Sequence, residues 1–166
     1  MSSVNLLGNG IGEAAADIVR AAEQHGKIQT LCGIKPDQKE ANFSSQELKD
    51  ADAVLLAYDI KVNAPLKSLS IGTNKLGVEG VGVLCESLKT NTTLETLDMQ
   101  GARENKLGAA EAKIIANMLK VNAPLTDLDI SLNNIGVDGA KAIAAVLPRC
   151  VQLQNGMRSA PPDARN

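Results

Sequence analysis

The amino-acid sequence predicts an α/β fold built as a solenoid, in which strand-plus-helix units stack along one axis. Three observations predict it. A short apolar frame recurs along the chain at a basic spacing of 28 residues. Each copy alternates apolar and polar residues, which is typical of a half-buried strand. Each copy is then followed by apolar residues four positions apart, which share one face of a helix. Repetition at such a period is typical of repeat architectures.

The frame reads L-x-x-L-x-(I/L)-x-x-N-x-(L/I)-G. It is complete in LKSLSIGTNKLG, which begins at Leu66, and in LTDLDISLNNIG, which begins at Leu125. A third copy, LETLDMQGARENKLG from Leu94, carries three additional residues before its asparagine. The first residues, MSSVNLLGNGIG, also fit, and QKEANFSSQELK fits with glutamine in the asparagine slot. The five marker positions are Asn9, Gln46, Asn74, Asn105 and Asn133.

Two insertions account for the unequal marker spacings. Gln46 to Asn74 spans 28 residues, as does Asn105 to Asn133, whereas Asn74 to Asn105 spans 31. Asn9 to Gln46 spans 37 residues, which places a nine-residue insertion near CGIKPDQKE. The segment IQTLCGI within this 28–40 insertion is either an additional strand, with Leu31 in the apolar slot, or a loop. The sequence leaves both possibilities open.

A helix is expected in the second half of each repeat. The apolar pairs that lie ten and fourteen residues after the markers are Val19/Glu23 (a weaker first copy), Leu56/Ile60, Leu84/Leu88, Ile115/Leu119 and Ile143/Leu147. Three of these helices lead into a similar ending: KVNAPL at 61–66, KTNTTL at 89–94 and KVNAPL at 120–125. Lysine in the last turn suits the helix dipole, and asparagine tolerates a left-handed residue after the helix.

The frame and the helix positions together resemble the leucine-rich-repeat family, in its ribonuclease-inhibitor-like class of long strand-plus-helix repeats. The resemblance covers roughly residues 1–153 and implies a right-handed horseshoe segment, with a parallel sheet on the concave side and helices on the convex side. A sixth copy is degenerate, because Leu153 keeps register but Gly156, Arg158 and Pro161 occupy the next slots. We therefore expect one solenoid domain at 1–153 and a flexible tail at 154–166.

Composition excludes several classes of function. The chain has 166 residues with a formal charge of −2, so the basic surface that nucleic-acid binding requires is not indicated. No run approaches the length of a membrane span, and no secretory signal is recognisable. Cys32, Cys85 and Cys150 form no CxxC pair or disulfide framework. A soluble protein of the reducing cytoplasm or nucleus is the expectation.

The sequence indicates no enzyme, no cofactor and no metal site. His25 is the single histidine and follows the first expected helix. Cys85 occupies the helix slot filled elsewhere by alanine, so a buried packing residue is the simpler interpretation. A Cys–His nucleophile would need these two residues brought together across two repeats. The glycine-rich stretches GNGIG and GVEGVG fall on repeat positions and match no complete phosphate-binding motif.

The marker amides are expected to be structural. At the turn that leaves a strand, such a side chain can bond main-chain groups of its own turn and of the adjacent one, which stacks the turns into a ladder. We expect this asparagine ladder at Asn9, Gln46, Asn74, Asn105 and Asn133. The longer Gln46 should distort its turn.

Function is expected on the residues between the frame positions, because alternate strand residues face opposite sides of a sheet. The central column of the concave face is Asn5, Asn42, Ser70, Asp98 and Asp129. The flanking columns are Ser3, Glu40, Ser68, Thr96 and Asp127 on one side, and Leu7, Ser44, Gly72, Gln100 and Ser131 on the other. This face is polar, lacks aromatic residues and is acidic at its C-terminal end.

We interpret this face either as a plain solvated surface or as a patch for a basic or polar protein partner, in a binding or scaffold role. The candidate binding residues are Asn5, Asn42, Ser70, Asp98, Gln100, Asp127, Asp129 and Ser131. The alternative is a subunit or fragment of a larger assembly, including a homo-oligomer, that is held through its ends. Val4, Leu6 and Ile11 would otherwise leave apolar edges beside an unpaired strand.

Overall fold

The computed structural model describes residues 3–63, 65–101 and 107–149. Helices and strands alternate along it. The helices are α1 (Ala14–His25), α2 (Asp50–Val62), α3 (Val78–Thr90), α4 (Ala109–Leu119) and α5 (Gly136–Ala144). The strands are β1 (Glu40–Asn42), β2 (Ser68–Ser70), β3 (Thr96–Asp98) and β4 (Asp127–Asp129), and a short 3-10 helix, η1, covers Leu147–Arg149.

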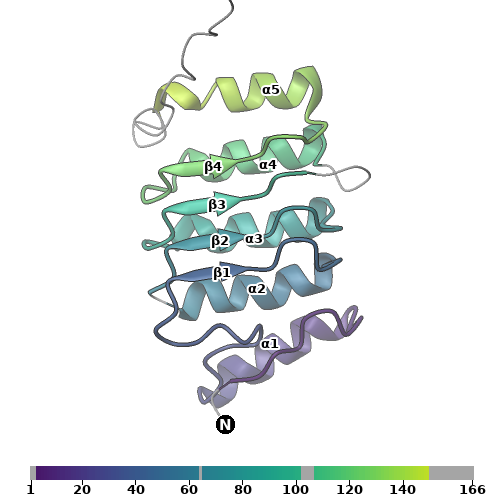
Figure 1. Ribbon diagram of the computed structural model, residues 1–166, viewed down its shortest axis with the longest axis vertical. Coiled ribbons are helices and arrows are strands. Elements are labelled where there is room, and N and C mark those ends of the chain that lie inside the picture. Colours follow the sequence, from purple (N-terminus) through teal and green to yellow (C-terminus); the bar gives the residue numbers. More distant parts are fainter. Residues whose placement is uncertain (1–2, 64, 102–106, 150–166) are drawn as a thin grey trace, which may run out of the picture.

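The strands form one parallel sheet in the order β1-β2-β3-β4; α2, α3 and α4 lie behind it in the same order, and α5 lies beyond β4 (Figure 1). Each strand pairs with the next in register, so that Ala41, Leu69, Leu97 and Leu128 lie side by side. Each helix contacts the helix of the adjacent repeat. This confirms the predicted α/β solenoid with strands on one side and helices on the other.

Aliphatic side chains fill the space between the sheet and the helices, as the near absence of aromatic residues requires. Leu69 of β2 and Leu97 of β3 are 0 % and 1 % exposed. The helix positions ten residues after the markers pack against them, and Leu56, Leu84 and Ile115 are 0–1 % exposed. Burial of one such aliphatic side chain contributes about 1.5–3 kcal/mol, so the repeated letters of the frame are the core of the fold.

The first copy of the frame does not join this sheet. Ser3 and Asn5 form isolated bridges with Thr30 and Cys32 instead of pairing with β1. Val4 N–H donates to the Thr30 carbonyl at 3.1 Å, and Leu6 N–H donates to the Leu31 carbonyl at 2.9 Å. The 28–40 insertion therefore supplies an extended segment of its own, and this segment takes the hydrogen bonds that a regular repeat would offer to β1.

A buried carboxylate holds this inserted segment. Asp59 of α2 is 0 % exposed and accepts hydrogen bonds from Leu31 N–H at 2.7 Å, from Cys32 N–H at 3.1 Å and from the Thr30 hydroxyl. Burial raises the pKa of Asp59, and these three donors act in the opposite direction. Leu31, which the sequence places in the apolar position of this segment, is buried at 2 % exposure.

The helix endings correct one expectation. Asn63 and Asn91 were expected to take left-handed conformations, but their φ angles are −93° and −70°. Their side-chain amides form hydrogen bonds instead, and Asn63 Nδ2 donates to the Lys35 carbonyl at 3.2 Å. The Asn91 Oδ1 accepts from Thr93 N–H at 3.0 Å and from Leu94 N–H at 2.7 Å. Asparagine is therefore needed here for its amide and not for its backbone tolerance.

Candidate functional site

The register of the sheet aligns the residues between the frame positions into columns. Glu40, Ser68, Thr96 and Asp127 form one column, and Asn42, Ser70, Asp98 and Asp129 form the next. Neighbouring members of a column lie about 4.8 Å apart along the sheet. Side chains in both columns are half-buried or exposed, whereas the frame residues Leu69 and Leu97 between them are buried. Asn5, which was assigned to the same column, lies opposite Cys32 and outside the four-stranded sheet.

Side chains of the central column bond to their own strand ends. The Oδ1 atoms of Asn42, Asp98 and Asp129 each accept the N–H of the residue two positions later, at 2.9, 2.9 and 2.8 Å. Asn5 does the same with Leu7 at 3.1 Å. The frame does not indicate these turns, although an Asn or Asp as the last residue of β1, β3 and β4 is the signal that could have shown them. The other carboxylate oxygen of Asp98 and of Asp129 makes no hydrogen bond to a described residue.

The C-terminal part of the sheet carries three carboxylates on adjacent strands. Asp98 lies beside Asp129, and Asp127 occupies the neighbouring column on β4. Beyond them, the Gln100 amide donates to the Ser131 hydroxyl at 3.0 Å, which orders two further candidate residues. Among the residues that the structure describes, no group of three or more His, Cys, Asp or Glu side chains has the geometry to hold a metal ion. This surface, which we call the acidic face (Asp98, Asp127 and Asp129), is the most charged part of the candidate site.

The marker asparagines lie under the turns that follow the strands. The Asn74 Oδ1 accepts from Gln46 N–H and Leu48 N–H, both at 3.0 Å, and its Nδ2 donates to the Phe43 and Ile71 carbonyls, both at 2.8 Å. Asn74 thereby joins its own turn to the turn of the preceding repeat.

Asn133 joins two turns in the same way. Its Oδ1 accepts from Leu107 N–H at 2.8 Å, and its Nδ2 donates to the Met99 and Ile130 carbonyls at 2.9 and 3.0 Å. Asn9 bonds only carbonyls of its own turn, those of Leu6 and Leu7. Asn105 lies outside the described residues.

Gln46 is exposed, and its turn contains a left-handed residue that the turns at Asn74 and Asn133 lack. The residue before each of these three markers has a φ between 56° and 60°, but at Gln46 the following residue, Glu47, also has a φ of 58°. The main chain of Gln46 still donates to Asn74. The amide side chain of Gln46 therefore lies outside the bonding pattern seen at the two asparagines.

A second set of asparagines, which follow the helices and which the repeat frame does not mark, bonds across the array. Asn63, Asn91 and Asn122 donate from Nδ2 to the Lys35, Ile60 and Leu88 carbonyls at 3.2, 3.1 and 2.7 Å. Each bond crosses to an earlier part of the array. The shared K-x-N ending was the available signal, because a helix end needs a donor of this kind for its last carbonyls.

The residues that nucleophilic catalysis would require are kept apart. Cys85 is 1 % exposed, and burial raises the pKa of its thiol to about 12. His25 is exposed in the last turn of α1, and within the described residues α1 makes no contact with α3, which carries Cys85. Cys32 is also buried, and burial together with the Asp59 carboxylate raises its thiol pKa. Both thiols are held in the unreactive, protonated form.

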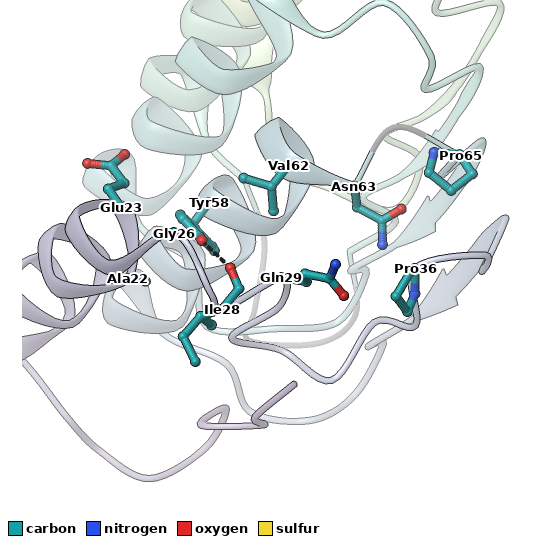
Figure 2. A pocket seen from close by; sticks show the side chains of 10 residues that line it. All are labelled: Ala22, Glu23, Gly26, Ile28, Gln29, Pro36, Tyr58, Val62, Asn63 and Pro65. Atoms are coloured by element: carbon teal, nitrogen blue, oxygen red, sulfur yellow. Dashed lines mark hydrogen bonds between the residues drawn. The ribbon is translucent and has the colours of Figure 1, made fainter. Parts of the chain in front are cut away.

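A pocket of about 600 Å³ lies beside the inserted segment (Figure 2). The Tyr58 hydroxyl donates to the Ile28 carbonyl at 2.6 Å on one wall. Asn63 lines another wall and is 5 % exposed, and its Oδ1 has no hydrogen-bond partner. That oxygen is itself buried, so a ligand in the pocket could not reach it without a rearrangement. The pocket brings together none of the candidate binding residues.

Comparison with known proteins agrees with the fold. A family model described as "Leucine Rich repeat" matches residues 62–85 and 121–144. No sequence among the curated proteins matches the chain. None of the helices in the described part of the chain is long and apolar enough to cross a membrane.

Two solved structures are similar over most of the chain. One, "Leiomodin-1 Actin-Binding Site 2 (ABS2)", has a TM-score of 0.60 and 16 % identity, and the match covers 82 % of this chain and 72 % of that one. The other is a tropomodulin C-terminal domain from Caenorhabditis elegans, with a TM-score of 0.56 and 17 % identity, covering 95 % and 90 %. At these identities the likeness establishes a shared fold.

Proposed function

This chain is a leucine-rich-repeat protein, and we propose that it is a non-catalytic module that binds another protein through the concave side of β1–β4. The ribonuclease-inhibitor-like class is compatible with its strand-plus-helix repeats. The observation that carries the proposal is the acidic face, because three carboxylates lie on adjacent strands of a rigid sheet. Two adjacent repeats supply these carboxylates, so the acidic face forms only when the repeats are stacked.

The partner that fits is a protein with a basic or hydrogen-bond-donating surface. Opposite charges on two surfaces raise the association rate and favour correct partners over wrong ones. The candidate contacts are Asn5, Asn42, Ser70, Asp98, Gln100, Asp127, Asp129 and Ser131, with Asn5 at the margin because it lies outside the sheet. Since one structural neighbour is titled as an actin-binding site, actin is the first protein to test. The proposed compartment is the cytoplasm or nucleus, where the free thiols of Cys32 and Cys85 stay reduced.

Affinity capture followed by mass spectrometry tests this function. The variant to use is Asp98→Asn/Asp127→Asn/Asp129→Asn, because asparagine removes the charge but keeps the acceptor that Asp98 and Asp129 use in their turns. Asn42 already makes the same turn in this sheet, so the fold should be retained. A matched control, Asp17→Asn/Glu79→Gln/Asp138→Asn, neutralises three exposed carboxylates on helices.

The expected result is a partner captured by the wild type and by the helix control and lost from the triple variant of the acidic face. A partner that all three proteins capture equally would contradict binding through the concave side.

A second candidate function is assembly through the ends of the array. The observation that favours it is the exposure of frame residues at both ends: Leu128, Val4 and Leu6 are half-buried, whereas Leu69 and Leu97 in the middle are at most 1 % exposed. An unstacked repeat leaves its apolar face in water. Binding that survives the triple variant of the acidic face but is lost in Val137→Lys would favour the ends, because Val137 is 70 % exposed on α5.

A further inference from the structure

Within the described residues, apolar side chains are exposed on the side of the last repeat that faces away from the array. Ile130 and Leu128 are half-buried, although their counterparts Ile71 and Leu69 are 3 % and 0 % exposed. Val137 in the first turn of α5 is 70 % exposed. Its counterpart in α3, Val78, which has a following repeat, is 47 % exposed. The counterpart in α2, Asp50, accepts from Gly77 N–H of the next repeat at 2.6 Å. The last repeat therefore presents the surface that elsewhere receives the following repeat.

The last repeat also carries a main-chain N–H group without a hydrogen-bond acceptor among the described residues. Three equivalent N–H groups, those of Phe43, Ile71 and Met99, donate to the next strand at 2.7, 2.8 and 2.8 Å, with Ser70, Asp98 and Asp129 as acceptors. Ile130 is the next member of this series, and its N–H has no acceptor among the described residues. The acceptor that would follow Ser70, Asp98 and Asp129 in the frame is the carbonyl of a central-column residue.

The first repeat presents the complementary groups. Asn5 is its central-column residue, and its carbonyl accepts no hydrogen bond within residues 3–63, 65–101 and 107–149. Asn9 is its marker. Asn74 and Asn133 each reach back to the preceding repeat, with Nδ2 on a carbonyl and Oδ1 on a main-chain N–H. Asn9 makes only the bonds within its own turn, so its backward-facing acceptor is unused in the described structure.

We propose that the first repeat of a second copy stacks on the last repeat of this chain and continues the array. The register of the sheet places Ser3 of the second copy beside Asp127 and Asn5 of the second copy beside Asp129. Ile130 N–H then donates to the Asn5 carbonyl of the second copy. Asn9 of the second copy donates to the Ile130 carbonyl and accepts from Ile135 N–H, as Asn74 does with Phe43 and Leu48. This deepens the second function proposed above.

The chain's own C-terminal residues fit this position less well than a second copy does. The frame slots that follow Leu153 hold Gly156, Arg158 and Pro161. Proline in the marker slot has no amide side chain, and glycine offers no apolar contact to Leu128. The first repeat supplies Val4, Leu6 and Asn9 in the same slots.

The contact is heterologous, because different surfaces of the two copies meet. A heterologous contact that does not close into a ring produces open linear assemblies. Each end can be blocked separately by substituting exposed residues, so that the monomer can stay folded. Asn9→Lys blocks the first repeat and Val137→Lys blocks the last. The matched controls are Asn117→Lys on α4 and Val121→Lys after it, since Asn117 is exposed and Val121 is 59 % exposed, and both lie away from the ends.

Sedimentation equilibrium of the full chain over a concentration series tests the proposal, with circular dichroism to verify that each variant is folded. We expect the weight-average mass of the wild type to rise past that of a dimer without a plateau. Each end variant alone should associate at least tenfold more weakly than the wild type, and each control should match it. An equimolar mixture of the two end variants should form a 1:1 dimer and nothing larger, because one intact end remains on each.

Three results would overturn the proposal. The first is a wild-type chain that stays monomeric at the highest soluble concentration. The second is a mass that stops at the dimer, which indicates a symmetric contact. The third is a mixture of the two end variants that stays monomeric. Asn9 is not among the candidate contacts of the acidic face, so Asn9→Lys should lose self-association but capture the partner like the wild type. Loss of partner capture in the acidic-face triple variant and loss of self-association in Asn9→Lys therefore report on the two proposals separately.

Discussion

Replacing Asn74 with alanine removes four hydrogen bonds, three that join the turn after β2 to the turn after β1 and one within the turn after β2. The side chain is almost buried, at 8 % exposure, so water cannot replace these bonds without opening the structure. Two N–H groups, on Gln46 and Leu48, lose their acceptor, and two carbonyls, on Phe43 and Ile71, lose a donor. At roughly 0.5–1.5 kcal/mol for each hydrogen bond, the free energy of unfolding should fall by about 2–6 kcal/mol.

Asn9→Ala is the matched control, because Asn9 occupies the same frame position in the first repeat. Asn9 is exposed and donates only to carbonyls of its own turn, at 3.0 and 3.4 Å. Its removal should lower the free energy of unfolding by less than about 1 kcal/mol.

Urea denaturation followed by circular dichroism measures both variants, at a protein concentration low enough to keep the chain monomeric. The midpoint should shift strongly for Asn74→Ala and little for Asn9→Ala. If Asn74→Ala unfolds within about 0.5 kcal/mol of the wild type, or if Asn9→Ala is equally damaging, the bonds between turns do not stabilise the array as argued.

Three further predictions concern the glycines of α3, the Asp59 carboxyl group and the cysteines. In α3, Gly82→Ala should raise the free energy of unfolding by about 0.5–1 kcal/mol, since an added Cβ meets nothing within 4 Å. Gly80→Ala should be about 1–3 kcal/mol less stable than Gly82→Ala, because its Cβ would lie 3.0 Å from the Asp50 Cα and 3.2 Å from the Ala53 Cβ; equal urea midpoints would contradict this packing. Because the folded state raises the pKa of Asp59, it binds that proton more tightly than the unfolded chain does, so this group's contribution to stability should decrease as the pH rises above the ordinary pKa of 3.8. Urea titrations across that range should show this decrease in the wild type and not in Asp59→Asn, and an unchanged slope in the variant would refute it. Finally, a thiol reagent should modify at most one of the three cysteines of the native chain, because Cys32 and Cys85 are buried with raised pKa values; rapid labelling of two or three thiols without denaturant would disprove that.

The repeat frame was sufficient to predict which residues share a column of the sheet. Ser68, Thr96 and Asp127 lie side by side, as the spacing indicates, because a fixed period in a parallel array determines the register. The first repeat was not predictable in this way. Its place beside Thr30 and Cys32 depends on the buried Asp59, a residue that no other repeat has at this position and that the frame does not mark.

The candidate site was predictable in position but not in its bonding. Spacing places Asp98 and Asp129 side by side in one column of the sheet, but it does not show whether a carboxylate faces solvent or its own strand end. In the structure one oxygen of each is already committed to a main-chain N–H. The asparagines at the helix ends were misinterpreted for a related reason, because their amides act across repeats, and such contacts are visible only once the repeats are stacked.

The affinity of the captured partner for the triple variant of the acidic face is the most direct test of a concave binding surface. At roughly 0.2–1 kcal/mol for each exposed charge pair, neutralising Asp98, Asp127 and Asp129 should weaken binding by about 3- to 150-fold. The loss should shrink as salt is added, because ions screen exposed charges. A dissociation constant that equals the wild-type value at low salt, while the helix control Asp17→Asn/Glu79→Gln/Asp138→Asn is the variant that loses affinity, would contradict the account.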